Sequence, residues 1–179
     1  MKWSYTIGRI AGTDIKVHVT FLILVAFWAL AGYQQGGPAG AVAASLMLLA
    51  LFACVLLHEF GHILMARRFG VRTPDVLLLP IGGVARLERI PSVPRQELLI
   101  AIAGPAVTLA IAVALYLVLL AIGAQPTLGQ LEPDSDVLTF LMRVNVFLLL
   151  FNLIPAFPMD GGRVLRAILA SRMGMVRGT

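Results

Sequence analysis

Four long apolar segments constrain the fold of this chain more than any other feature of its sequence. A helix needs about 20 predominantly apolar residues to cross the hydrocarbon core of a bilayer. Segments of roughly this length, the first somewhat short, occupy His18–Tyr33, Ala39–Ala66, Leu98–Gly123 and Val137–Phe157. They are apolar on every face, unlike the surface helices of soluble proteins. The sequence therefore predicts an all-α polytopic membrane protein with four transmembrane helices.

The basic residues indicate how such a protein is oriented. The 14 Lys and Arg residues lie before the first segment, between the second and third, and after the fourth, and only Arg143 falls elsewhere. The positive-inside rule makes these connectors and both termini cytoplasmic. Because the charges cluster between apolar segments, the net charge of +5 does not indicate nucleic-acid binding. The expected surroundings are the lipid bilayer of a prokaryotic plasma membrane, and the sequence sets no oligomeric state.

Two connectors on the basic side have the pattern of β-hairpins. "YTIGRIAGTDIKVHV" places β-prone runs around Gly12-Thr13-Asp14, and "PDVLLLPIGGVARLERI" places them around Gly82-Gly83. We expect two small hairpins at the cytoplasmic membrane surface, able to pair into one sheet. Irregular loops are the alternative.

The second apolar segment contains "HEFGH", residues 58–62. Histidines four residues apart share one helix face, so His58 and His62 can reach one ion. Glu59 is close enough to act on a water bound to that ion, which is the arrangement of zinc hydrolases. Ionisable groups inside a membrane are costly and are functional by default. The motif therefore predicts a zinc site with Glu59 as general base.

A catalytic zinc takes three protein ligands and keeps one position for water. The candidates for the third ligand are His18, Cys54, Asp160 and the carboxylates of the loops. Asp160 follows the fourth segment at the same, cytoplasmic end as the two histidines, so topology favours it. His18 is expected at the interface or beside a ligand rather than on the metal. Cys54 is expected to be a small core residue that can touch the site.

The segment before Asp160 is interrupted by Pro155 and Pro158, which disturb a helix. Broken helices at membrane depth are tolerated where they line a water-filled cavity. Asn152 faces the same region and can bind a peptide carbonyl or an oxyanion, or it can bridge two helices.

These motifs resemble the site-2 protease family of intramembrane zinc metalloproteases. The family pattern is H-E-x-x-H followed by N-x-x-P-x-x-x-x-D-G, and Asn152, Pro155, Asp160 and Gly161 fall on its second half. "GTDIKVHVTFL", "LPIGGVARLE" and "IAGPAVTLA" are similar to the branch that includes the sporulation protease. The resemblance implies one zinc ion per chain held by His58, His62 and Asp160, and a transmembrane protein as substrate. Residues 1–179 are interpreted as one membrane-embedded core, which leaves open that it is truncated before further helices or a regulatory domain.

The expected function is zinc endopeptidase activity on a peptide bond in or near a transmembrane segment, as in regulated intramembrane proteolysis. Gly82 and Gly83 are expected to support substrate binding or the transition state, because the hairpin that carries them can capture an unwound substrate by strand addition. The alternative is a non-catalytic or transporter-like zinc-binding membrane protein.

Overall fold

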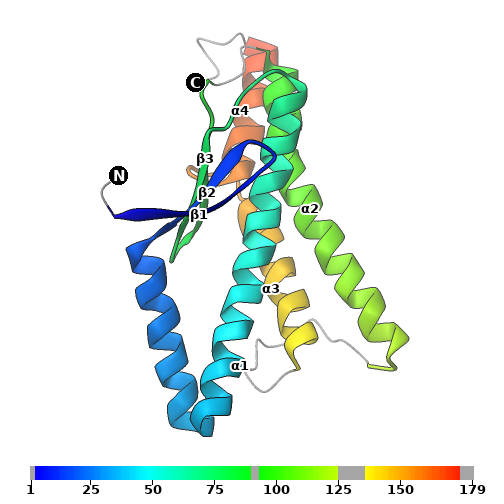
Figure 1. The fold of residues 1–179 in the computed structure, drawn as a ribbon. Coiled ribbons are helices and arrows are strands. Elements are labelled where there is room, and N and C mark those ends of the chain that lie inside the picture. Colours follow the sequence, from blue (N-terminus) through cyan, green and yellow to red (C-terminus); the bar gives the residue numbers. More distant parts are fainter. Residues whose placement is uncertain (1–2, 90–92, 125–135, 174–179) are drawn as a thin grey trace.

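The chain folds into four helices and a small sheet, all within the residues described by the computed structural model, which are 3–89, 93–124 and 136–173 (Figure 1). The elements are β1 Ser4–Ile10, β2 Thr13–His18, α1 Val19–Arg68, β3 Asp75–Leu79, β4 Gly82–Arg86, α2 Pro94–Ala121, α3 Val137–Asn152 and α4 Asp160–Met173. The mostly helical architecture is confirmed. The prediction that both termini are cytoplasmic, and the alternative that the chain is truncated, concern residues 1–2 and 174–179, which lie outside the described residues.

Helix α1 contains both of the first two predicted segments except His18, which ends β2. Its 50 residues are interrupted only at Gly36 and Gly37, where the backbone is not helical, and Pro38 follows. Figure 1 shows the two legs of α1 folded back beside each other. Gly32 and Gly40 touch where the legs meet, and a Cβ on either residue would collide with the opposing backbone. The two legs therefore form a helical hairpin with almost no loop.

Two helices, α1 and α2, are long and apolar enough to cross a membrane by length and composition. The windows that meet this test have mean hydropathies of 2.6 in α1 and 2.5 in α2. Helix α3 is apolar but has only 16 residues. Among the described residues, the structure thus contains two candidate spans, and the predicted four transmembrane helices are not confirmed.

The fourth predicted segment ends earlier than expected. Helix α3 stops at Asn152, five residues before the predicted limit at Phe157, and a short irregular connection leads into α4. Pro155 and Pro158 explain the early end, because proline lacks a backbone N–H and disfavours helix at the residue before it. Helices α3 and α4 follow each other along α2, and Asp160 begins α4 directly after the irregular connection (Figure 1).

The two hairpins pair into one sheet, as predicted. The strand order is β1-β2-β3-β4, in which β2 and β3 are parallel and the other two pairs are antiparallel. The predicted turns are misplaced: the first consists of Ala11 and Gly12, and the second of Pro80 and Ile81. Gly82 and Gly83 already belong to β4 and pair with Leu79 and Leu78.

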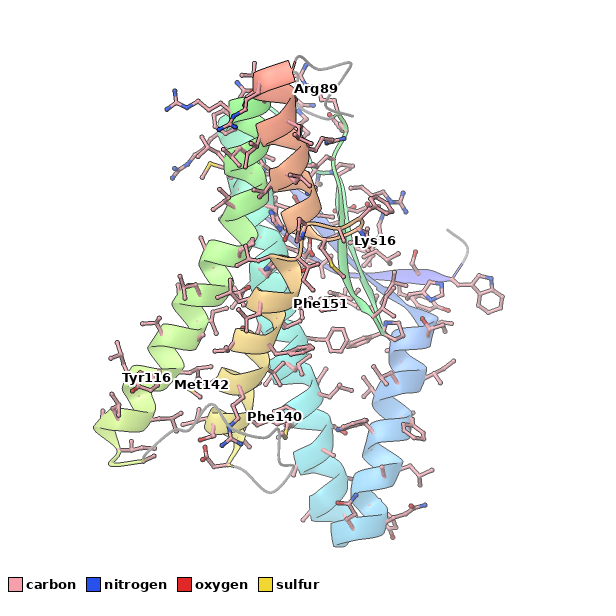
Figure 2. The ribbon with its side chains drawn as sticks, turned by 180° about the vertical axis from the view of Figure 1, so that it is seen from behind. Lys16, Arg89, Tyr116, Phe140, Met142 and Phe151 are labelled. Atoms are coloured by element: carbon pink, nitrogen blue, oxygen red, sulfur yellow. The ribbon has the colours of Figure 1, made fainter. Side chains whose placement is uncertain are left out.

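The sheet packs on the second leg of α1 through a shared apolar core. Ile15 and Val17 of β2 and Val76 and Leu78 of β3 belong to one buried cluster with residues of α1, which are Phe21, Leu48, Phe52, Phe60 and Ile63. In Figure 2, Lys16 and Arg89 lie in the half of the molecule that holds the sheet and α4, whereas Tyr116, Phe140 and Met142 lie in the other half. The core thereby fixes the sheet beside the part of α1 that carries the HEFGH motif.

Candidate metal centre

Three buried side chains converge between α1 and the start of α4. Nε2 of His58 and Nε2 of His62 each lie 3.1 Å from Oδ2 of Asp160, and the two Nε2 atoms lie 3.1 Å from each other. All three residues are at most 8% exposed. The sequence predicted this set of three, and the structure brings it together from segments about one hundred residues apart.

The outer nitrogens of both imidazoles are held by α2. Nδ1 of His62 lies 2.7 Å from the carbonyl oxygen of Ile100, which can only accept a hydrogen bond, so this nitrogen carries the proton. Nδ1 of His58 lies 2.8 Å from the hydroxyl of Thr108, which in turn donates to the carbonyl of Gly104. These contacts leave both Nε2 lone pairs directed at the centre, as partners beyond the ligands do in metal sites.

The geometry fits a zinc ion. Ligands placed tetrahedrally around zinc at ~2.0–2.1 Å lie about 3.3 Å apart, close to the three distances observed here. Three electron-rich atoms this close need a shared positive charge, either a proton or a metal ion. Two imidazoles and one carboxylate form a catalytic zinc set that leaves a fourth position for water.

Asp160 is suited to remain ionised at this site. Burial alone would raise the pKa of the Asp160 carboxyl. The adjoining imidazoles of His58 and His62 favour the ionised carboxylate when a proton sits on Nε2, and this effect outweighs burial and holds the pKa well below its usual range. The carboxylate is therefore ready to bind a cation at neutral pH.

Helix α2 can approach the site because it carries Gly104 there. A Cβ at this position would overlap the imidazole of His62. Gly61 of α1 similarly faces the backbone of Ala103. The "IAGPAVTLA" segment thus supplies both close packing and the Thr108 hydroxyl.

Glu59 lies beside the three candidate ligands and faces a cavity. It lines a cavity of about 420 Å³ together with His58 and Asp160. The backbone of Ala85 hydrogen-bonds to its carboxylate, and a Cβ at Gly83 would collide with its side chain. Strand β4 therefore packs directly against the carboxylate that can act on a metal-bound water.

The other predicted residues divide into two groups. Asn152, Gly82 and Gly83 line the same cavity as His58 and Asp160. His18 instead caps the first helix, where its Nδ1 accepts a hydrogen bond from the backbone N–H of Thr20. Cys54 is a free, half-buried thiol on α1. Within the described part of the chain, neither His18 nor Cys54 joins the group of possible metal ligands.

Sequence reasoning missed the residues that support the site from α2 and α4. Glu97 is almost fully buried at the start of α2 and forms an ion pair with Arg166 of α4. Arg163, one turn after Asp160, has its guanidinium 4.0 Å from the other carboxylate oxygen of Asp160. A helical periodicity of apolar residues after Asp160 (Leu165, Ile168 and Leu169) was the available signal for α4.

An apolar helical frame that encloses an H-E-x-x-H helix and a distant aspartate defines a membrane metalloprotease. Comparison with known protein families supports this class. The chain belongs to the site-2 protease family: the family model described as "Peptidase family M50" matches residues 46–134 and 134–178.

Individual relatives support this placement. A zinc metalloprotease of Methanocaldococcus jannaschii is 38% identical over 183 residues, which is 100% of this chain and 49% of the relative. Stage IV sporulation protein FB of Bacillus subtilis is 29% identical over 89% of this chain and 49% of its own length. A solved structure described as a site-2 protease from Methanocaldococcus jannaschii matches with a TM-score of 0.69 and 37% identity, over 98% of this chain and 76% of that chain. The chain spans about half the length of these two curated relatives.

Proposed function

We propose that this chain is the catalytic core of a zinc endopeptidase that cleaves a peptide bond in or near the transmembrane segment of a membrane-tethered protein. The observation that carries the proposal is the convergence of His58, His62 and Asp160 beside Glu59, at a cavity large enough for a peptide. One zinc ion per chain is the expected cofactor.

The residues around the cavity divide the chemistry among them. Bound zinc supplies a Lewis acid for the scissile carbonyl and lowers the pKa of its water toward ~7. Glu59 accepts the proton of the attacking water and returns it to the leaving amine. Asn152, at the end of α3, is placed to hold a substrate carbonyl through its side-chain amide. The Thr108 hydroxyl and the Ile100 carbonyl keep the imidazoles of His58 and His62 in their orientation throughout.

The walls of the cavity favour a substrate that comes from the membrane. Apart from the site residues, the side away from β4 is lined by apolar side chains from both legs of α1, which are Leu24, Trp28, Leu48, Leu51, Phe52 and Val55. A transmembrane helix can reach this side without leaving an apolar environment. Its peptide bonds must unwind locally before hydrolysis, because a helix protects them by hydrogen bonds.

Strand β4 is suited to hold the unwound segment. It is an edge strand of the sheet, and Gly82 and Gly83 lie at the cavity beside Glu59. Extended peptides commonly bind by adding a strand to such an edge. Introducing proline at single positions along Gly82–Arg86 should lower cleavage where the replaced N–H points away from β3, with zinc content unchanged. Unchanged cleavage across the whole series would exclude strand addition.

We further propose four membrane-crossing segments: the two legs of α1, α2 and α3. The sheet, α4 and both termini are then cytoplasmic, and the active site lies near the cytoplasmic side of a prokaryotic plasma membrane. The distribution of Lys and Arg supports this orientation through the positive-inside rule.

The Glu59→Gln variant tests the activity. In liposomes with a transmembrane reporter substrate, it should keep its zinc and lose cleavage by a factor of at least about 10². Zinc content measured by mass spectrometry provides the control. A transporter-like zinc protein would show no cleavage by the wild type, and a Glu59→Gln variant that cleaves normally would refute the assignment of the base.

A further inference from the structure

The cavity at the metal centre is one end of a longer groove. A second cavity, of about 590 Å³, shares Glu59, Gly83 and Asn152 with it. A third, of about 680 Å³, shares Ala85, Met159 and Arg163 with the second. The groove therefore runs from the legs of α1, past the metal ligands and along β4, to α4. We call its third cavity the α4 arm.

The two ends of the groove differ in charge. Beyond Glu59 and the candidate metal ligands, the described residues that line the end at α1 include no charged side chain. The α4 arm is lined by apolar side chains, among them Leu87, Phe157, Leu165 and Leu169, and by two arginines, Arg163 and Arg166. Among its described lining residues there is no Asp or Glu.

The two arginines of the α4 arm are not equivalent. Arg166 is engaged by the buried carboxylate of Glu97, which neutralises its charge. The side chain of Arg163 is 30% exposed and its guanidinium lies 4.0 Å from Oδ1 of Asp160, while Oδ2 of that carboxylate faces the imidazoles. When a divalent metal ion is bound, the two positive charges of the ion offset the negative charges of Asp160 and Glu59. The charge of Arg163 is then the excess positive charge in the groove.

We propose that the α4 arm binds the substrate segment just outside the transmembrane helix and that Arg163 selects an acidic side chain in this segment. The inference rests on the proposed function and narrows its substrate class. An extended chain on β4 places alternate side chains toward opposite sides. One set can then face the apolar wall of α4 while a carboxylate meets the guanidinium of Arg163, which is well matched to carboxylates.

Binding of synthetic peptides tests this proposal without requiring cleavage. Each peptide has one apolar helix followed by the same flanking segment, with Glu, Gln or Lys at one flanking position varied along the series. They are titrated by fluorescence anisotropy against zinc-loaded Glu59→Gln protein in detergent. At the best position, the Glu peptide should bind up to about fivefold more tightly than the Gln peptide, as expected for a partly exposed charge pair. The Lys peptide should bind more weakly than both.

Substitutions of Arg163 separate selection from support of the metal site. Arg163→Gln should abolish the difference between the Glu and Gln peptides, Arg163→Lys should retain part of it, and Arg163→Glu should reverse the order in favour of Lys. Arg172→Gln is the matched control, because it removes the same charge from α4 on the opposite side of the helix and does not line the arm. This variant should keep the wild-type order.

Two outcomes would overturn the inference. One is equal binding of the three peptides at every flanking position, and the other is an Arg163→Glu variant that weakens all three equally, since a damaged metal site would do the same. If the peptides bind with the expected order but wild-type protein cuts none of them, the proposed proteolysis fails while the selectivity of the groove stands.

Discussion

At the scale of single residues, the hydroxyl of Thr108 is the clearest determinant of metal affinity outside the ligands. It accepts from Nδ1 of His58 and so keeps the lone pair of Nε2 directed at the metal position. Thr108→Val should weaken zinc binding by about 10–100-fold, the usual effect of losing such a partner. Thr108→Ser retains the hydroxyl and should bind zinc nearly normally. Competition with a chromophoric chelator measures both, and equal affinity of the Val and Ser variants would contradict this role.

The sequence predicted the candidate metal ligands but not the residues that support them, for a physical reason. His58, Glu59 and His62 form a local helical pattern, and Asp160 followed from placing the end of α3 on the same side of the membrane. The contacts of Thr108 and of the Ile100 carbonyl instead depend on how α2 crosses α1. No spacing within one segment encodes that crossing.

At the scale of elements, the ion pair between Glu97 and Arg166 fastens α4 to α2 and thereby holds Asp160, the first residue of α4. Its two partners should respond differently to substitution. Arg166→Leu leaves a buried, unpaired carboxylate and should cost about 3 kcal/mol of stability. Glu97→Gln leaves an arginine that can turn to water, so its cost should be smaller.

Thermal unfolding in detergent distinguishes these variants. The double variant Glu97→Gln, Arg166→Leu should be more stable than Arg166→Leu alone, because it no longer buries an unpaired charge. Both variants that lack Arg166 should also bind zinc more weakly, since α4 carries a ligand. If Arg166→Leu and the double variant were equally stable, the ion pair between Glu97 and Arg166 would not be what holds α4.

Elements were predictable where their pattern was strong and local. Alternating β-prone runs identified both hairpins, but the turns were misplaced because Pro80 and Ile81 form the second turn and leave Gly82, with its φ of 136°, to begin β4. Helix α4 was missed because the two prolines and two glycines around Asp160 mask its start. The kink at Gly36 and Gly37 was expected as a loop between two helices.

At the scale of the whole molecule, the end that holds the sheet and α4 lies opposite the end formed by the turn of α1. The sheet and α4 carry six of the twelve described Lys and Arg residues, whereas the turn between the legs of α1 lies at the other end (Figure 1). The proposed topology therefore puts Gln35, beside that turn, outside the cell and Arg172, near the end of α4, inside. Both side chains are exposed, so a cysteine at either position can react with a maleimide.

Cysteine labelling tests this arrangement directly, because Cys54 is the only cysteine in the chain. In a Cys54→Ala background, Gln35→Cys should react with a membrane-impermeant maleimide in intact bacterial cells. Arg172→Cys should react only after the membrane is permeabilised. Zinc content serves as the control for folding of each variant. Labelling of both positions from the same side would mean that the first leg of α1 and the rest of the helical frame do not cross the membrane as proposed, and the apolar end of the groove would then face water rather than lipid.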